Sequence, residues 1–271
     1  VIMDSSLAGN VEESATGPQA VPLALSHRFP WVTHEVLSYT SVLDLEILAL
    51  VPPEVQNGFS VCLPRSGEPI CSTREGNDPE FFLFYTDVLT EIGVRFPFSE
   101  FQMQVLDHLH LAPSQLHPNG WAFVQAFKIL CQKLEVPCTC PLFFYFFTVY
   151  TGRSGKEPLE RKEWVSFRGR TDKDSDRRLF GLFSESFKGF KDKFFKVAVV
   201  PGRRPFFLSP SNSSNPWRFP LYWTSTHYDF PPISYRTDKA QLSDSDANST
   251  ARILSFRDSG SLRPISHYIQ C

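Results

Sequence analysis

Cations and aromatic side chains alternate over residues 161–204, and this pattern could contact the phosphates and bases of a nucleic acid. Lysine and arginine neutralise phosphates, and aromatic rings stack on bases. The aromatic members include Trp164, Phe167 and Phe190. The cations predicted to contact RNA or DNA are Arg168, Arg170, Arg177, Arg178, Lys188, Lys191, Lys193 and Lys196. A competing interpretation is that the aromatic residues form core and the cations lie on its solvated opposite face.

Histidine and cysteine residues between positions 108 and 140 raise the question of a metal site. Structural zinc needs four ligands, usually in close pairs such as C-x₂-C. Cys138 and Cys140 are separated by a single residue, and Cys131 falls on an apolar helical stripe, where a small buried side chain is expected. The histidines, which fall on different turns, are His108, His110 and His117. We therefore expect no metal and no cofactor.

Motifs for enzyme chemistry are incomplete. Gly152–Lys156 has two residues between its glycines, whereas a phosphate-binding loop needs four, and Glu157 replaces the required Ser or Thr. Asp258-Ser259-Gly260 matches the tripeptide of aspartic proteases but lacks the apolar flanking strands of that site. The chain has neither G-x-S-x-G nor G-x-G-x-x-G. We expect a protein that is not an enzyme.

Charge is distributed unevenly along the 271 residues. Residues 1–100 hold 4 Lys/Arg against 14 Asp/Glu, and residues 152–204 hold 15 against 8. A basic segment attracts polyanions, which adds to the nucleic-acid prediction for residues 161–204. The six scattered cysteines fit reduced thiols, and neither a secretory signal nor a membrane span is recognisable. The expected location is intracellular, in the nucleus or cytoplasm, without secretion or membrane contact.

Both ends of the chain have the composition of flexible segments. The 22 prolines thicken toward the ends, where Ser, Asn and Asp are also common. Such segments bury too little apolar surface to offset the entropy lost on ordering. We predict a disordered tail over 1–30, an N-terminal helical segment over 31–92, and a Pro/Ser-rich flexible tail over 205–271. Within that last tail, residues 218–224 form an isolated aromatic island.

Residues 96–147 carry the clearest helical pattern. Ser99 begins a Ser-x-x-Gln capping box, and Pro113 blocks continuation of that helix. Apolar residues from Trp121 to Leu134 follow a 3.6-residue period, and Pro141 suits the first turn of a third helix over Leu142–Phe147. Three short helices with tight links predict a small bundle.

Beyond this helical core, residues 152–204 are predicted to form a basic α/β part, with strands over Glu163–Arg168 and Lys193–Val200. The fold class that we predict is therefore mainly α with a small β element (α+β). It comprises a small helical bundle core and flexible N- and C-terminal tails.

Several strings resemble the plant gypsy-type transposon domain, whose members also carry the name transposase. They are LDHLHLAPSQLHPNG (106–120), Trp121–Leu134, LFFYFF (142–147), WVSFR (164–168), KGFKDKFF (188–195) and FPLYWT (219–224). The resemblance covers about residues 80–225, and it places a transposon domain over 93–204. It implies a helical, plant, element-derived protein associated with the gag-like region of retroelements, with no established catalytic residues.

Two classes of function follow from the resemblance. The first is a non-enzymatic, gag-like protein that self-associates and contacts RNA or DNA through residues 161–204. The second is a transposase or nuclease of a mobile element, although the segments of a full element are absent from the chain. An inert translation of a degenerate element is a third interpretation.

Overall fold

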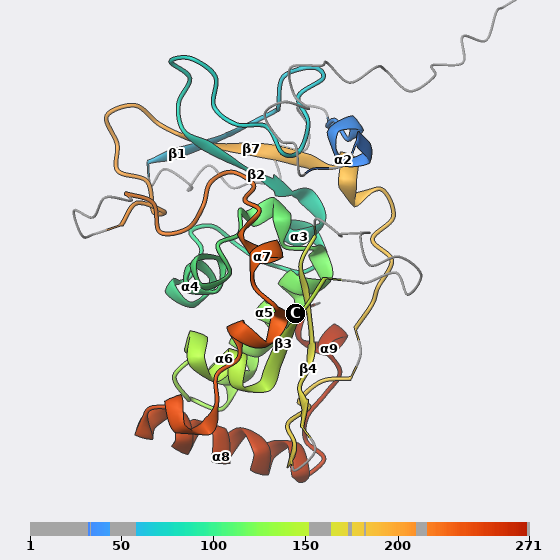
Figure 1. Cartoon of the computed structure of the whole chain (residues 1–271), viewed down its shortest axis with the longest axis vertical. Helices are drawn as coiled ribbons and strands as arrows, with labels where there is room; N and C mark the ends of the chain where they lie inside the picture. Colours follow the sequence, from blue (N-terminus) through green and yellow to red (C-terminus); the bar gives the residue numbers. More distant parts are fainter. Residues whose placement is uncertain are drawn as a thin grey trace, which may run out of the picture.

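The computed structural model describes residues 32, 34–43, 58–151, 164–172, 175–181, 183–209 and 216–269. The tail predicted over 1–30 and the loop at 152–156 lie outside these residues. Within them the chain forms short helices around three small antiparallel sheets (Figure 1).

The largest sheet has three antiparallel strands in the order β1-β7-β2. These strands are β1 (Phe59–Cys62), β2 (Phe81–Tyr85) and β7 (Phe194–Val199). Phe59 pairs with Val199, and Phe84 pairs with Phe195. Every residue of β2 is buried, so an all-apolar run explains this strand better than an alternating pattern would. The sheet lies at the upper end of the molecule in Figure 1.

Two further sheets have two strands each. One pairs β3 (Phe147–Tyr150) with β4 (Ser166–Gly169), and the other pairs β5 (Thr171–Asp172) with β6 (Ser175–Asp176). The predicted strands over Glu163–Arg168 and Lys193–Val200 correspond to β4 and β7. The third predicted helix ends one residue early, because Phe147 already has the extended backbone of β3.

The helices are distributed along the whole described chain. Those in the first half are α2 (His34–Ser38), α3 (Thr86–Thr90), α4 (Glu100–Leu109), the 3₁₀ turn η2 (Pro113–Gln115), α5 (Pro118–Lys133) and α6 (Cys140–Phe146). Those in the second half are η3 (Phe190–Asp192), α7 (Thr226–Asp229), η4 (Pro232–Tyr235), η5 (Lys239–Gln241), α8 (Asp244–Asp258) and α9 (Ile265–Ile269).

The capping box predicted at Ser99 is present. The Ser99 hydroxyl accepts a hydrogen bond from the backbone N–H of Gln102, and the Gln102 side chain accepts one from the backbone N–H of Ser99 at 2.9 Å. Helix α4 ends at Leu109, before Pro113, and His110 takes a left-handed conformation there. Local sequence chemistry therefore sets both ends of this helix.

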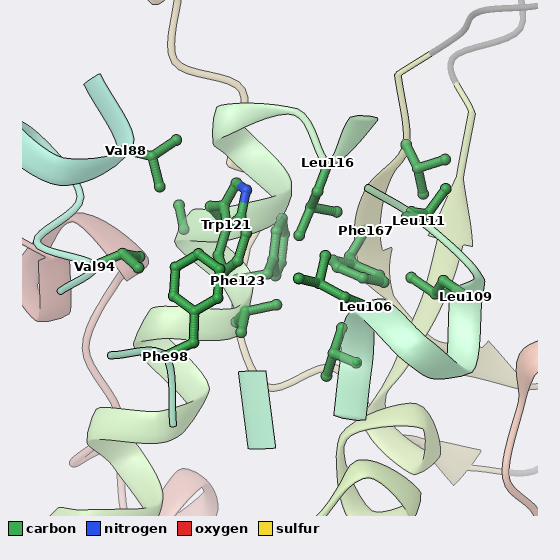
Figure 2. Packing of buried hydrophobic residues seen from close by; sticks show 14 of the residues in the cluster. Val88, Val94, Phe98, Leu106, Leu109, Leu111, Leu116, Trp121, Phe123 and Phe167 are labelled. Atoms are coloured by element: carbon green, nitrogen blue, oxygen red, sulfur yellow. The ribbon is translucent and has the colours of Figure 1, made fainter. Parts of the chain in front are cut away.

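Helix α5 is the centre of a single hydrophobic core. Figure 2 shows Trp121 and Phe123 of this helix among side chains from other elements, including Phe98 and Phe167. The 3.6-residue period leaves Gln125 on the side of α5 opposite the apolar stripe, where a solvated polar residue is expected, but Gln125 is buried. Its amide donates to the Gly93 carbonyl at 3.1 Å and accepts from Gln102 at 3.3 Å.

The predicted helical bundle core is wrong. The apolar faces of the helices pack on the sheets as well as on one another, so that the core is shared and the fold is α+β. Phe143 of α6, for example, contacts Phe167 of β4 with 4.9 Å between ring centroids. Helix periodicity alone could not reveal these partners, because they lie far away in the sequence.

The predicted flexible C-terminal tail is also wrong. Residues 216–269 include α8 and α9, and α9 packs on α5. The aromatic island at 218–224 is not isolated, since Phe219, Leu221 and Trp223 are all buried in the common core. The polar composition of α8 reflects its largely solvated surface, while Ile253 supplies a buried anchor.

Candidate nucleic-acid interface

The eight predicted cations separate into two groups in space. The arginines lie on or beside β4, and the lysines lie on or before β7. Figure 1 shows β7 at the upper end of the molecule and β4 in its lower half. The structure therefore does not bring the eight side chains into one continuous surface.

Two of the four lysines are engaged in contacts within the protein. The Lys196 ammonium lies 2.8 Å from both carboxylate oxygens of Glu68 and 4.0 Å from the Phe81 ring centroid. Both side chains of this ion pair are only 12% exposed. Lys193 is half-buried, and Lys188 is exposed. The competing interpretation, a cationic flank to an aromatic core, describes Lys196 better than a phosphate contact does.

Lys191 joins α2 to the rest of the molecule. Its ammonium lies 3.1 Å from the Glu35 carboxylate and 2.8 Å from the Tyr39 hydroxyl. It also lies 4.5 Å and 4.9 Å from the ring centroids of Tyr39 and Trp164. The hydrogen bond from Tyr39, followed by the contacts with Lys191, lowers the pKa of Glu35. This arrangement holds a helix in place and leaves little of the cation for an external anion.

The arginines, by contrast, form a cluster around the β3–β4 pair. Arg168 is exposed on β4 and lies opposite Thr148 of β3. Its guanidinium carbon is 5.7 Å from the ring centroid of Tyr150, which is 43% exposed at the end of β3. A cation and an aromatic ring are therefore presented together on one strand pair, as a stacking platform for a base would require.

Arg177 and Arg178 extend this cluster from the segment that follows β6. Arg177 stacks on Tyr145 of α6, with 4.3 Å from its guanidinium carbon to the ring centroid. Exposed Arg178 approaches β4 at Gly169, where an added Cβ would lie 3.1 Å from the Arg178 Cγ. A larger residue at position 169 would therefore require the Arg178 side chain to shift by a few tenths of an ångström.

Arg170 has a different role, because it is 5% exposed. Its guanidinium donates to the Thr237 carbonyl at 2.6 Å and to the Asp238 carboxylate at 2.7 Å. The hydrogen bond from Arg170 lowers the pKa of Asp238, and the nearby charges of Arg177 and Arg236 lower it further. Arg170 thus anchors the segment after η4, whereas its neighbours in the cluster are more accessible.

Arg236 belongs to the same cluster and was missed from the sequence. Its Nε donates to the Thr148 hydroxyl at 3.1 Å, although the two residues are 88 positions apart. The region in which it lies was predicted to be a flexible tail, and no local pattern could have linked it to β3. We call Tyr150, Arg168, Arg177, Arg178 and Arg236 the arginine face.

The metal and protease candidates are separated in the structure. His108 packs on Phe144, and the His117 ring accepts the N–H of Asn119 as an N-cap. The Cys140 thiol faces the Gln104 carbonyl at 3.7 Å. Among the described residues, no three His, Cys, Asp or Glu side chains are grouped as metal ligands would be. Asp258 ends α8 in an ion pair with its neighbour Arg257.

The string LAPSQLHPNGW forms a junction between distant parts of the chain. The Gln115 side chain accepts hydrogen bonds from the N–H groups of Ala112 and Thr224, at 3.1 and 2.9 Å, and donates to the Thr224 carbonyl at 2.8 Å. The Trp223 indole donates to the Ser114 hydroxyl at 2.8 Å. The backbone of residues 115–117 also pairs with Val165. The N–H of His117 donates to the Val165 carbonyl, and the N–H of Val165 donates to the Gln115 carbonyl.

The junction therefore joins three strings on which the family resemblance rests, at 106–120, 164–168 and 219–224. Its polar groups bond to one another inside the protein, and Gln115 is fully buried. Gly120 is closely packed: an added Cβ would lie 2.7 Å from a methyl carbon of Leu116, which would have to shift. We name this region, Leu111–Trp121 with Val165 and Trp223–Thr224, the junction; its chemistry is structural.

The described residues thus fold as an α+β domain with a packed hydrophobic core. Its β3–β4 strand pair presents an exposed arginine beside an exposed tyrosine. Comparison with known families matches residues 84–151 to the family described as "Putative gypsy type transposon". The match supports a gypsy-type transposon domain over that segment, which is the family that the sequence resembles; residues 152–204, which the sequence assigned to the same domain, lie outside the match. No curated protein and no solved structure is significantly similar to this chain.

The matched segment extends from within β2 to just after β3. It contains Leu111–Trp121 of the junction, but Val165 and Trp223–Thr224 lie beyond it. Of the arginine face, only Tyr150 falls inside the match. Across the described residues, no helix is both long and apolar enough to cross a membrane.

Proposed function

We propose that this protein is a non-enzymatic, gag-like component of a gypsy-type transposon that contacts RNA or DNA through the arginine face. The observation that carries the proposal is the pairing of exposed Arg168 with the 43% exposed ring of Tyr150. Guanidinium groups neutralise phosphates, and an exposed tyrosine offers a surface for a base. The transposon family supports an element-derived origin for the chain.

The proposal narrows the surface predicted from the sequence. Phosphate contacts are assigned to Arg168 and Arg178, which are exposed, with Arg177 and Arg236 beside them. Arg170, Lys191 and Lys196 are assigned to structure because each is buried or half-buried where it donates to a carboxylate, whereas Arg168 and Arg178 are exposed. Self-association belongs to the same proposal and is supported by the gag-like resemblance. An intracellular location, in the nucleus or cytoplasm, belongs to it as well and is supported by the scattered cysteines, which fit reduced thiols.

The test is salt-dependent binding of a single-stranded RNA by the full chain. We expect the double variant Arg168→Gln/Arg178→Gln to bind more weakly. The slope of log K against log salt should fall by about 0.7 for each phosphate that is no longer neutralised. Tyr150→Ala is expected to weaken binding by about 1–3 kcal/mol with little change in that slope, because a stacked ring releases no counterion.

The matched control is Arg252→Gln/Arg263→Gln, which removes the same charge from exposed arginines elsewhere. If both double variants weakened RNA binding equally, binding would depend only on the net charge of the protein, and this would contradict a defined binding face. Light scattering with and without RNA tests self-association. A protein that stays monomeric and does not bind RNA at low salt would contradict the gag-like proposal. Metal-dependent strand cleavage would instead favour the nuclease class.

A further inference from the structure

The register of β3 and β4 places four side chains on one side of this strand pair. Thr148 lies opposite Arg168, and Tyr150 lies opposite Ser166. Residues two positions apart on a strand share a face, so these four side chains lie on the same side of the pair. The residues on the other side are buried in the core: Phe147, Val149 and Phe167. We call the side that carries Tyr150 and Arg168 the outer side.

The segment that follows α7 is held against this outer side. The Arg236 Nε donates to the Thr148 hydroxyl at 3.1 Å, and Thr148 is buried. The N–H of the next residue, Thr237, donates to the Phe144 carbonyl of α6 at 3.3 Å. Tyr235, one position before Arg236, is buried in the common core. Three consecutive residues therefore fix this segment beside β3 and α6.

The same segment presents a second exposed aromatic ring. Phe230, which follows α7, is 50% exposed, and its ring meets that of Tyr235 edge-on with 6.5 Å between centroids. Pro231 and Pro232 come next, and each proline ring restricts its own φ. The N–H of Ser234 donates to the Pro231 carbonyl at 2.9 Å and closes a turn. The Phe230 ring is thus mounted on constrained backbone, so less entropy is lost when a ligand binds it.

Two exposed aromatic rings therefore accompany the cations of the arginine face. Of the large apolar side chains that are exposed in the described part of the chain, Tyr150 and Phe230 are the aromatic ones. Arg168 lies on the same outer side, and Arg236 belongs to the segment held against it. Stacking needs an open base face, which an unpaired base offers and a base inside a duplex does not.

We propose that the arginine face is selective for single-stranded over double-stranded nucleic acid, with Tyr150 and Phe230 as two stacking platforms. This inference rests on the proposed nucleic-acid contact and names its substrate class. Phe230 lies outside the basic segment at 161–204, so charge patterning in the sequence gives no reason to select it.

Exposed apolar side chains can also dock another protein. Ile233, three positions after Phe230, is 63% exposed, and a protein partner would bury both side chains in one apolar contact. The cations on the same side favour a nucleic acid, because Arg168 would lose its hydration against an apolar surface without gaining an anion. A nucleic acid offers bases to the rings and phosphates to the cations together.

The experiment compares a short single-stranded RNA with the blunt duplex of the same sequence, by fluorescence anisotropy on the full chain at one salt concentration. We expect wild type to bind the single strand more tightly than the duplex. Phe230→Ala should weaken single-strand binding by about 5- to 150-fold, the range for one lost stacking contact, and should leave duplex binding nearly unchanged. Phe230→Trp should retain single-strand binding, whereas Phe230→Leu should not, because leucine keeps the apolar bulk without a π face.

Ile233→Ala is the matched control, since it removes an exposed apolar side chain of the same segment that has no ring. It should bind the single strand as wild type does. The inference is overturned if the duplex binds as tightly as the single strand, or if Phe230→Leu binds the single strand as tightly as wild type. Equal loss of self-association in Phe230→Ala and Ile233→Ala, with RNA binding intact, would overturn it in favour of a protein partner.

Failure of the proposed function has a different signature. In that case wild type would bind neither form of RNA, or Arg168→Gln/Arg178→Gln would bind RNA as wild type does, and the inference would fall with it. If instead the double variant weakens binding while Phe230→Ala has no effect, the nucleic-acid contact stands and the stacking role of Phe230 is wrong.

Discussion

The junction and the arginine face use polar side chains in opposite ways. At the junction, Gln115 is fully buried and makes three hydrogen bonds to the backbone of Ala112 and Thr224. On the arginine face, Arg168 is exposed and lies beside an aromatic ring. A buried polar group must be satisfied within the protein, whereas an exposed cation remains available to an external anion.

The segment that carries the family resemblance is therefore not the segment proposed to bind nucleic acid. The unusual string LAPSQLHPNGW belongs to the junction, where it joins residues more than 100 positions apart. The arginine face has a plainer sequence and lies largely outside the matched segment. The part of this chain that is easiest to recognise is therefore a structural device, and the candidate for binding has to be found from geometry.

The largest effect is expected at the junction. Gln115→Ala removes the acceptor of two backbone N–H groups and a donor to a carbonyl, and the partners remain buried or half-buried. We expect a loss of about 2–4 kcal/mol in the free energy of unfolding, because an unsatisfied buried group costs about 1–3 kcal/mol. Urea denaturation, monitored by circular dichroism, measures this free energy of unfolding. Gln104→Ala, at an exposed position of α4, is the control and should change stability by under about 0.5 kcal/mol.

A smaller effect should distinguish two arginines only two positions apart. Arg170→Ala removes hydrogen bonds to Thr237 and Asp238 and should cost about 1–3 kcal/mol of stability. Arg168→Ala should leave the urea midpoint nearly unchanged and weaken RNA binding instead. If Arg168→Ala destabilised the fold as much as Arg170→Ala, the division of the cluster into anchor and interface would be wrong.

The smallest effect concerns pH. Hydrogen bonding from Arg170, more than any other interaction, holds the pKa of Asp238 below its ordinary value. A carboxyl whose pKa is lower in the folded state stabilises the protein above its unfolded pKa of about 3.9 and loses that contribution as the pH falls further. Asp238 is largely exposed, so the contribution is small. Thermal melts between pH 5 and 3 should therefore fall slightly less steeply in Asp238→Asn than in wild type. Identical slopes would show that the ion pair is energetically silent.

Local patterns predict local structure well in this chain. The capping box at Ser99, the stop before Pro113 and the strands at β4 and β7 all follow from a few neighbouring residues. The errors occur where the decisive partner is distant. The helical period places Gln125 on a polar surface, yet it bonds to Gly93 in the interior. Composition assigns the Ser- and Asp-rich C-terminal segment to a tail, yet α9 packs on α5.

The candidate site divides in the same way. The four arginines of the arginine face lie in segments of ordinary composition, and Arg236 could be found only through its bond to Thr148. Composition indicates that residues 161–204 are basic, but composition cannot show which cations are already paired. Lys196 and Arg170 look the same in the sequence as Lys188 and Arg168, and their burial distinguishes them.

Neighbouring residues were sufficient to specify the helix ends, two of the strands and the resemblance to a gypsy-type transposon domain, because each of these depends on a short stretch of chain. Long-range packing decided that the fold is α+β rather than a bundle and that residues 216–269 belong to the core. It also separated the eight cations into two places. Each of these outcomes depends on contacts between distant segments, which bring together side chains that no local spacing relates.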